Sequence, residues 1–160
     1  MSLYALIRPL IFCLDPERAH GLAIQALKAG LLPRHAPFSD PLLKMRLWKL
    51  DFPTPVGLAA GFDKNAEVVD AMLAQGFGFV EAGTVTPRAQ PGNPKPRMFR
   101  LAADRTVINR LGFNNDGLEA FRAKVASRQG KPGIFGANVG ANKDAGDPVR
   151  DYVTGIRALY

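Results

Sequence analysis

Two apolar stripes with helical spacing open the chain. Leucine and isoleucine recur every three or four positions across residues 3–14, and a second stripe covers residues 19–27. Between them, Asp15 stands where a helix N-cap is expected and Pro16 where the first helical residue is expected. Gly30 is placed to end the second helix. We therefore expect two short amphipathic helices at the start of the chain.

The pattern changes after Pro53 to alternating strands and helices. Residues 55–61, 77–85 and 134–139 are apolar or small without a helical stripe, which is typical of buried parallel strands. Apolar positions with helical spacing follow each run. The helices are expected to begin at Asp63–Glu67, after an Asn115-Asp116 cap, and before Val149. Alternating β and α units predict a parallel α/β fold.

A long excursion separates the second and third units. Residues 87–97 ("PRAQPGNPKPR") are rich in proline and glycine and predict a loop. The segments "MFRL" and "TVINR" flank "AADR", which predicts a β-hairpin. The excursion therefore covers residues 87–113 and lies outside the parallel sheet.

Small residues gather where the first strand is expected to end, in the stretch "GLAAGFDKN". We call residues 57–61 the small-residue ledge. Ligands in parallel α/β folds bind at the carboxyl ends of strands, and a flat aromatic ligand lying on backbone requires small side chains. The alternative is that these residues only allow a helix to pack close to the strand. The spacing alone does not decide between the two.

Three polar residues add to the site hypothesis: Lys64, Asn109 and Asn138 each lie near a predicted strand end. A lysine offers three donors and a positive charge to an anion, and asparagine offers both a donor and an acceptor. Together they suit a planar, charged heterocycle. Each one alone is also a common turn or cap residue.

Charge and composition narrow the partners. The formal net charge is +7, which favours an anionic partner, but there is no run of five basic residues, so nucleic acid is not expected. The single cysteine, Cys13, fits a reducing compartment, and a secretory signal is not expected, because no cleavage-site pattern follows an apolar run. Residues 1–50 carry seven basic and three acidic side chains, a difference of +4. The first two helices could therefore lie on a membrane or pack as a hairpin on the main domain.

Five motifs carry a family resemblance. They are "LDPERAHGLAIQAL", "FPTPVGLAAGFDKN", "EAGTVTPRAQPGNPKPRMFRL", "INRLGFNNDG" and "GANVGANKD". In the same order, they resemble class 2, quinone-dependent dihydroorotate dehydrogenase over nearly the whole chain. The resemblance implies oxidation of dihydroorotate to orotate in pyrimidine biosynthesis, with FMN as hydride acceptor and a membrane quinone as final acceptor. It also implies peripheral attachment to the cytoplasmic side of the cell membrane.

The resemblance implies a (β/α)8 TIM barrel preceded by a small helical domain. Residues 1–40 would form the helical membrane and quinone-tunnel domain, and residues 41–160 the first three strands of the barrel. The family's serine base is expected after Tyr160, as are a second lysine and the FMN phosphate site. We therefore expect these 160 residues to need a carboxyl-terminal part for catalysis. A catalytically silent half-barrel binding module is the alternative.

The resemblance assigns roles to three groups of residues. The flavin would be lined or bound by Ala60, Gly61, Phe62, Asp63, Lys64, Thr84 and Asn138. The substrate would meet Lys64, Asn109, Arg110, Leu111, Gly112 and Phe113, with Lys64 assisting catalysis at the orotate carboxylate. His20 and Arg100 match positions near the quinone tunnel, and no metal is expected.

Overall fold

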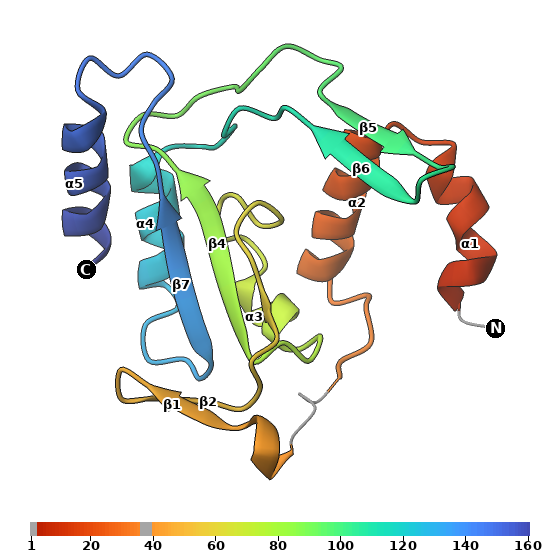
Figure 1. The fold of residues 1–160 in the computed structure, drawn as a ribbon, viewed down its shortest axis with the longest axis horizontal. Helices are drawn as coiled ribbons and strands as arrows, with labels where there is room; N and C mark the ends of the chain where they lie inside the picture. The colour runs from red at the N-terminus through yellow and green to blue at the C-terminus, as the bar shows by residue number, and fades with distance from the viewer. Residues whose placement is uncertain (1–2, 36–39) are drawn as a thin grey trace.

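In a computed structural model that describes residues 3–35 and 40–160, a parallel sheet is flanked by helices, with a β-hairpin at each end of its strands (Figure 1). The helices are α1 (Leu3–Phe12), α2 (Pro16–Lys28), α3 (Val69–Leu73), α4 (Leu118–Ala126) and α5 (Pro148–Leu159), with a 3₁₀ turn η1 at Pro41–Leu43. The strands are β1 (Met45–Leu47), β2 (Leu50–Phe52), β3 (Gly57–Leu58), β4 (Phe79–Val85), β5 (Met98–Leu101), β6 (Thr106–Asn109) and β7 (Ile134–Val139).

The parallel sheet has the strand order β3-β4-β7 in the described residues, which confirms the predicted alternation. Val80 pairs with Leu58 of β3 on one side and with Phe135 of β7 on the other, so the central strand β4 is paired on both edges. Strands consecutive in the β/α series are neighbours in the sheet. This is the order of a β/α barrel rather than of a doubly wound sheet, whose strand order reverses.

The core lies between the sheet and its covering helices. Phe121 of α4 and Val80 and Val85 of β4 are almost completely buried in it. Ile24 and Leu27 of α2 join the same cluster. Each such side chain contributes about 1.5–3 kcal/mol when fully buried. Helix α2 is therefore packed firmly on the main domain.

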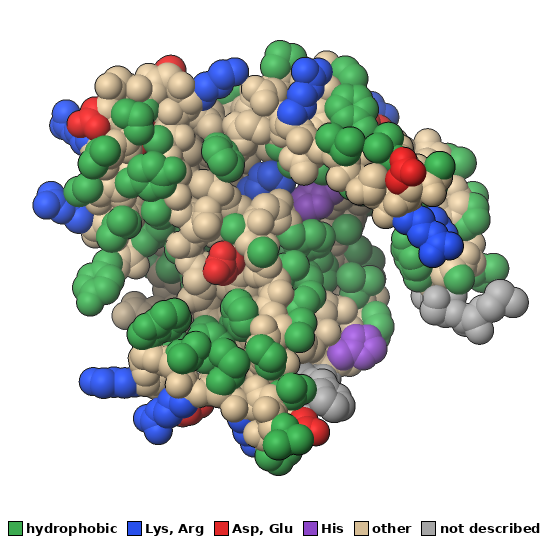
Figure 2. All heavy atoms as spheres, in the orientation of Figure 1, with side chains coloured by type: hydrophobic (Ala, Val, Ile, Leu, Met, Phe, Trp, Pro, Cys, Tyr) green, Lys and Arg blue, Asp and Glu red, His purple; other side chains and the backbone are tan. Residues whose placement is uncertain are grey.

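Helix α1 behaves differently. Its apolar stripe stays exposed, with Leu6 75% and Leu10 73% exposed, and hydrophobic side chains gather over this part of the surface (Figure 2). Each of the two interpretations of the amino-terminal helices therefore suits one helix. Helix α2 packs on the main domain, whereas α1 presents the exposed apolar face that the membrane interpretation requires. None of the helices in the described ranges combines the length and hydropathy needed to cross a bilayer.

The two hairpins lie at opposite ends of the parallel strands (Figure 1). The predicted hairpin of the excursion is confirmed as β5–β6, with Met98 opposite Asn109. The hairpin β1–β2 was not predicted. Its turn residues Trp48 and Lys49 both have positive φ, 50° and 67°. Glycine or asparagine usually occupies such turn positions, and neither is present here to indicate the turn.

Three sequence predictions about element ends were wrong. The strand at 55–61 is reduced to the two residues of β3. The helix expected from Asp63 begins only at Val69. The helix expected after an Asn115-Asp116 cap has Gly117 at its N-cap and no side-chain cap, because the Asn115 side-chain oxygen accepts hydrogen bonds from the backbone N–H groups of Gly117 and Thr86 instead.

Asp63 explains the delayed helix. Its side chain is buried, only 1% of the residue being exposed, and its two carboxylate oxygens accept hydrogen bonds from the backbone N–H groups of Glu67 and Val68, both at 2.8 Å. The carboxylate therefore holds residues 63–68 as a wide turn. Ala66 in this turn has φ 53°, which a helix does not allow.

We expect Asp63→Ala to lower the free energy of unfolding by about 2–4 kcal/mol, because two backbone donors lose a charged acceptor. Asp63→Asn keeps one oxygen and should cost less. The matched control is Asp51→Ala, whose side chain is 79% exposed and should change stability by less than about 0.5 kcal/mol. Urea unfolding followed by circular dichroism measures all three. Equal effects at positions 63 and 51 would contradict the role of the buried turn.

Candidate functional site

A cavity of about 470 Å³ lies beyond the carboxyl ends of β3 and β4. It is bounded by α2, the ledge loop, the end of β4 and the excursion hairpin. The lining residues are His20, Ala60, Gly61, Phe62, Lys64, Thr84, Met98, Asn109, Leu111, Gly112 and Phe113. Residues predicted to meet a cofactor, a substrate and a quinone thus line one space, although they come from segments up to 93 positions apart, from His20 to Phe113.

The small-residue ledge has two functions in the structure. A Cβ built at Gly61 meets no atom within 4 Å, and its φ is 114°, so this residue opens to the cavity. A Cβ at Gly57 would instead lie 2.3 Å from the ring of Phe79 on β4. Gly57 is therefore a packing residue, and the flat floor predicted for residues 57–61 is confined to the part near Gly61. The close neighbour of Gly57 is a strand residue, not a helix.

Gly83 joins the ledge loop to the sheet. Its carbonyl accepts the N–H of Gly61 and its N–H donates to the carbonyl of Asp63, both at 2.8 Å. A Cβ at this position would lie 2.4 Å from the carbonyl oxygen of Asn138, and φ is 123°, so only glycine fits. The cavity floor is therefore held by backbone hydrogen bonds.

Thr84 lines the cavity at the next position. Its hydroxyl donates to the side-chain oxygen of Asn138 at 2.7 Å. Asn138 is linked to the cavity through this bond and is not itself part of the lining. The bond orients the amide of Asn138, since its oxygen is the acceptor.

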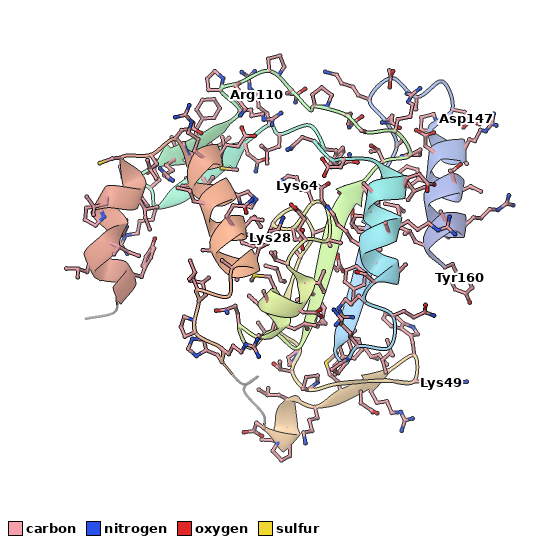
Figure 3. All side chains as sticks on the ribbon, turned by 180° about the vertical axis from the view of Figure 1, so that it is seen from behind. Lys28, Lys49, Lys64, Arg110, Asp147 and Tyr160 are labelled. Atoms are coloured by element: carbon pink, nitrogen blue, oxygen red, sulfur yellow. The ribbon has the colours of Figure 1, made fainter. Side chains whose placement is uncertain are left out.

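Lys64 lies at the centre of the molecule, between α2 and the end of β4 (Figure 3). Its Nζ donates to the carbonyl of Gly61 at 2.7 Å. Burial lowers the pKa of Lys64, and Glu17 and Asp63 act against that shift while Arg97 adds to it. The lysine is thus a partly desolvated cation directed at the ledge rather than at bulk water.

His20 forms the helical side of the cavity. Its ring meets Phe62 edge to face with centroids 5.0 Å apart. Burial lowers the pKa of His20, and the charge of Lys64 lowers it further. A histidine with a lowered pKa is neutral at pH 7 and presents a mainly apolar ring with one donor and one acceptor.

Three predicted site residues point elsewhere. Asp63 is turned into the protein, as described above. Arg100 donates to the carbonyls of Phe12 and Leu14 and lies 4.7 Å from the Phe12 ring centroid, so it ties the hairpin to α1. Arg110 donates from Nη2 to the carbonyl of Pro96 at 3.1 Å. None of the three is among the cavity-lining residues.

An ion pair beside the cavity was not predicted from the sequence. Arg97 and Glu17, 80 positions apart, share two hydrogen bonds from the Arg97 Nε atom at 3.1–3.2 Å and one from Nη2. The Arg97 side chain is 7% exposed. Hydrogen bonding by Arg97 holds the pKa of Glu17 below its usual value, against the opposing effect of burial.

The fold and the cavity define a partial β/α barrel with a site at the carboxyl ends of its strands. A family model for dihydroorotate dehydrogenase matches residues 42–160. The chain therefore belongs to the dihydroorotate dehydrogenase family.

Individual relatives agree with this assignment. Proteins named dihydroorotate dehydrogenase (quinone) from Azorhizobium caulinodans and Parvibaculum lavamentivorans are each 58% identical over 99% of the chain. The crystal structure of DHODH from Eimeria tenella in complex with ferulenol superposes with a TM-score of 0.83, at 43% identity over 91% of the chain. The chain spans about 45% of the two curated relatives and 41% of the Eimeria tenella chain.

Two lysines provide a test of the site electrostatics. Burial lowers the pKa of Lys64, whereas a hydrogen bond and the charge of Glu67 raise the pKa of the exposed Lys28. As pH rises, Lys64 should therefore lose its proton before Lys28. NMR of lysine ε-carbons in the isotope-labelled chain measures both titrations. Glu67→Gln should move only the Lys28 titration to lower pH, and a Lys64 midpoint at or above that of Lys28 would contradict the desolvated site.

Proposed function

We propose that this chain contributes the flavin-facing and quinone-facing part of an enzyme that oxidises (S)-dihydroorotate to orotate and passes the electrons to a membrane quinone. The supporting observation is that one cavity of about 470 Å³ collects Lys64, Thr84, Asn109 and His20 beside the open ledge at Gly61. Family membership and the quinone-dependent relatives agree with this assignment.

The cavity fits FMN as the cofactor. Gly61 leaves open space above backbone, which a planar ring system requires, and any larger residue there would fill that space and strain a φ of 114°. Ala60 and Phe62 would flank the ring, and Thr84 and Asn138 would supply hydrogen bonds. FMN, when bound, supplies the acceptor for hydride.

The substrate would lie between the ledge and residues 109–113, which we call the substrate wall. Lys64 would exchange its bond to the Gly61 carbonyl for one to the substrate carboxylate, a charge-assisted hydrogen bond. Asn109, whose side-chain oxygen accepts only a long 3.5 Å bond from the N–H of Leu111, would pair with the pyrimidine ring. These groups orient the substrate and exclude water, which is the protein's share of a hydride transfer.

The free face of α1 would rest on the membrane. Leu6 and Leu10 are exposed, and Arg8 lies 4.8 Å from the ring centroid of Phe12 on the same helix. An apolar helix face with basic residues suits an interface rich in anionic lipid, on the cytoplasmic side of the cell membrane. Quinone would then pass from the lipid toward His20.

The remaining strands of the barrel would complete the site. The outward face of α5 carries exposed Val149, Tyr152, Val153 and Ile156, apolar area that further β/α units of the barrel can cover. Those units would also carry the serine that takes the substrate proton.

The test is a chimera that joins this chain to the remaining part of the Azorhizobium caulinodans relative. The chimera should bind flavin and oxidise dihydroorotate with quinone, whereas the chain alone should do neither well. In the chimera, Lys64→Met should lower kcat/KM roughly 10- to 100-fold through loss of one charged hydrogen bond.

Lys49→Met, at the tip of the distant β1–β2 hairpin (Figure 3), is the matched control and should leave turnover unchanged. A chimera that binds flavin but does not oxidise dihydroorotate would contradict the proposal and would favour a catalytically silent binding module. Substantial turnover by the chain alone would contradict the need for further strands.

Membrane attachment can be measured separately by co-sedimentation of the chain with phosphatidylglycerol vesicles. Leu6→Ser combined with Leu10→Ser should weaken binding at least about tenfold, because two exposed leucines lose their apolar contribution. Val149→Ser on α5 changes an equally exposed residue, 70% exposed, and should have no effect. Equal losses at both places would point to nonspecific adsorption rather than to α1.

A further inference from the structure

The substrate wall has little secondary structure of its own. Apart from Asn109, which ends β6, residues 110–113 belong to no helix or strand, and Gly112 and Phe113 both have positive φ. A segment of this kind keeps one geometry only if its neighbours hold it. The neighbour that holds it is the stretch of residues 90–97, which we call the 90–97 loop.

Hydrogen bonds attach the wall to the 90–97 loop along most of its length. The carbonyl of Arg110 accepts from the Asn93 side chain at 2.7 Å, and the carbonyl of Leu111 accepts from the Asn93 N–H at 3.0 Å. The Gln90 side chain donates to the carbonyls of Gly112 and Phe113, both at 3.2 Å. The wall therefore takes its shape from the loop.

Arg97 holds the loop in turn. Its Nη1 donates to the carbonyls of Pro91 and Asn93 at 2.6 and 2.9 Å, and its own carbonyl accepts the N–H of Arg110 at 2.8 Å. The other side of the guanidinium is taken by the carboxylate of Glu17 on α2. Arg97 thus connects helix and loop through its side chain, and the wall through its backbone carbonyl.

Gly92 shows how closely these parts approach. A Cβ at this position would lie 2.2 Å from the carbonyl oxygen of Leu111 and 2.8 Å from Nη1 of Arg97. The loop backbone passes between the guanidinium and the wall with no room for a side chain. A small displacement of Arg97 would therefore be transmitted to the wall.

We propose that Arg97 is the positioning residue of the substrate wall, and that Glu17 anchors it from α2. The inference rests on the proposed function, since it assigns a role in substrate affinity. It adds that the helix carrying His20 also sets the geometry of the substrate side, by way of Arg97. Lysine cannot replace arginine here, because one ammonium group cannot reach Glu17 and both loop carbonyls in the fork geometry.

The test compares two arginines in the chimera. Arg97→Lys should lower kcat/KM for dihydroorotate roughly 10- to 100-fold, mostly through a higher KM, with orotate affinity falling in parallel. Arg128→Lys is the matched control. Arg128 is also shielded, with a side chain 12% exposed that donates to Asp70 and to the carbonyl of Pro132, but it lines no part of the site cavity. The Arg128→Lys chimera should lose about as much thermal stability as the Arg97→Lys chimera and keep the KM of the wild-type chimera.

If Arg97→Lys folds poorly, a second variant tests the same inference. Glu17→Gln keeps the size of the anchor and removes its charge, and it should raise KM in the same direction. Amide hydrogen exchange at residues 110–113 should quicken in both site variants and not in Arg128→Lys. If the wild-type chimera is active but the Arg97→Lys and Arg128→Lys variants have equal KM values, the inference is wrong and the proposed function still stands. A wild-type chimera without turnover would overturn the proposed function and the inference with it.

Discussion

The structure around the cavity depends on the exchange of backbone hydrogen bonds between Gly83 and the loop that follows β3. No side chain could take part, because a Cβ at Gly83 would run into the backbone of Asn138 on the next strand. The loop after β3 and the end of β4 are therefore joined at Gly83 through main-chain atoms, and the next residue, Thr84, adds a side-chain bond to Asn138. Asp63 makes this arrangement stable, since its carboxylate satisfies the N–H groups that the wide turn leaves without helical partners. The cavity floor can therefore lack large side chains, because backbone hydrogen bonds and the Asp63 carboxylate hold it in place.

The opposite side of the cavity is built on another principle. Residues 110–113 of the wall belong to no strand. Backbone bonds from the 90–97 loop and the side chains of Gln90 and Asn93 hold them, with Arg97 at the junction of the loop and α2. Burying an ion pair is costly unless its hydrogen bonds are complete, and here the guanidinium has acceptors on every nitrogen. The two sides of the cavity therefore differ in what holds them: backbone bonds at the floor, and an arginine anchored on a helix at the wall.

Much of this was predictable from local pattern, and the rest was not for identifiable reasons. Strand 134–139 and the 98–109 hairpin match because their apolar runs and turns are local signals. The β1–β2 hairpin was not predicted because its turn residues, Trp48 and Lys49, have a backbone conformation more typical of glycine. The late start of α3 and the Glu17–Arg97 pair depend on contacts that only the folded chain brings together. Many of the residues that the motif resemblance singled out line one cavity, yet the motifs did not distinguish a residue that lines it, such as Gly61, from one that supports it, such as Asp63.

The bond between the Lys64 ammonium and the Gly61 carbonyl has a consequence for how tightly any anion can be held. The lysine already has a strong partner at rest, so an arriving carboxylate gains only the difference between two good acceptors. An anion at this position is therefore held less tightly than a lysine without such a partner would hold it. The bond also gives the ammonium group a defined resting position, so the side chain is ordered before any anion arrives.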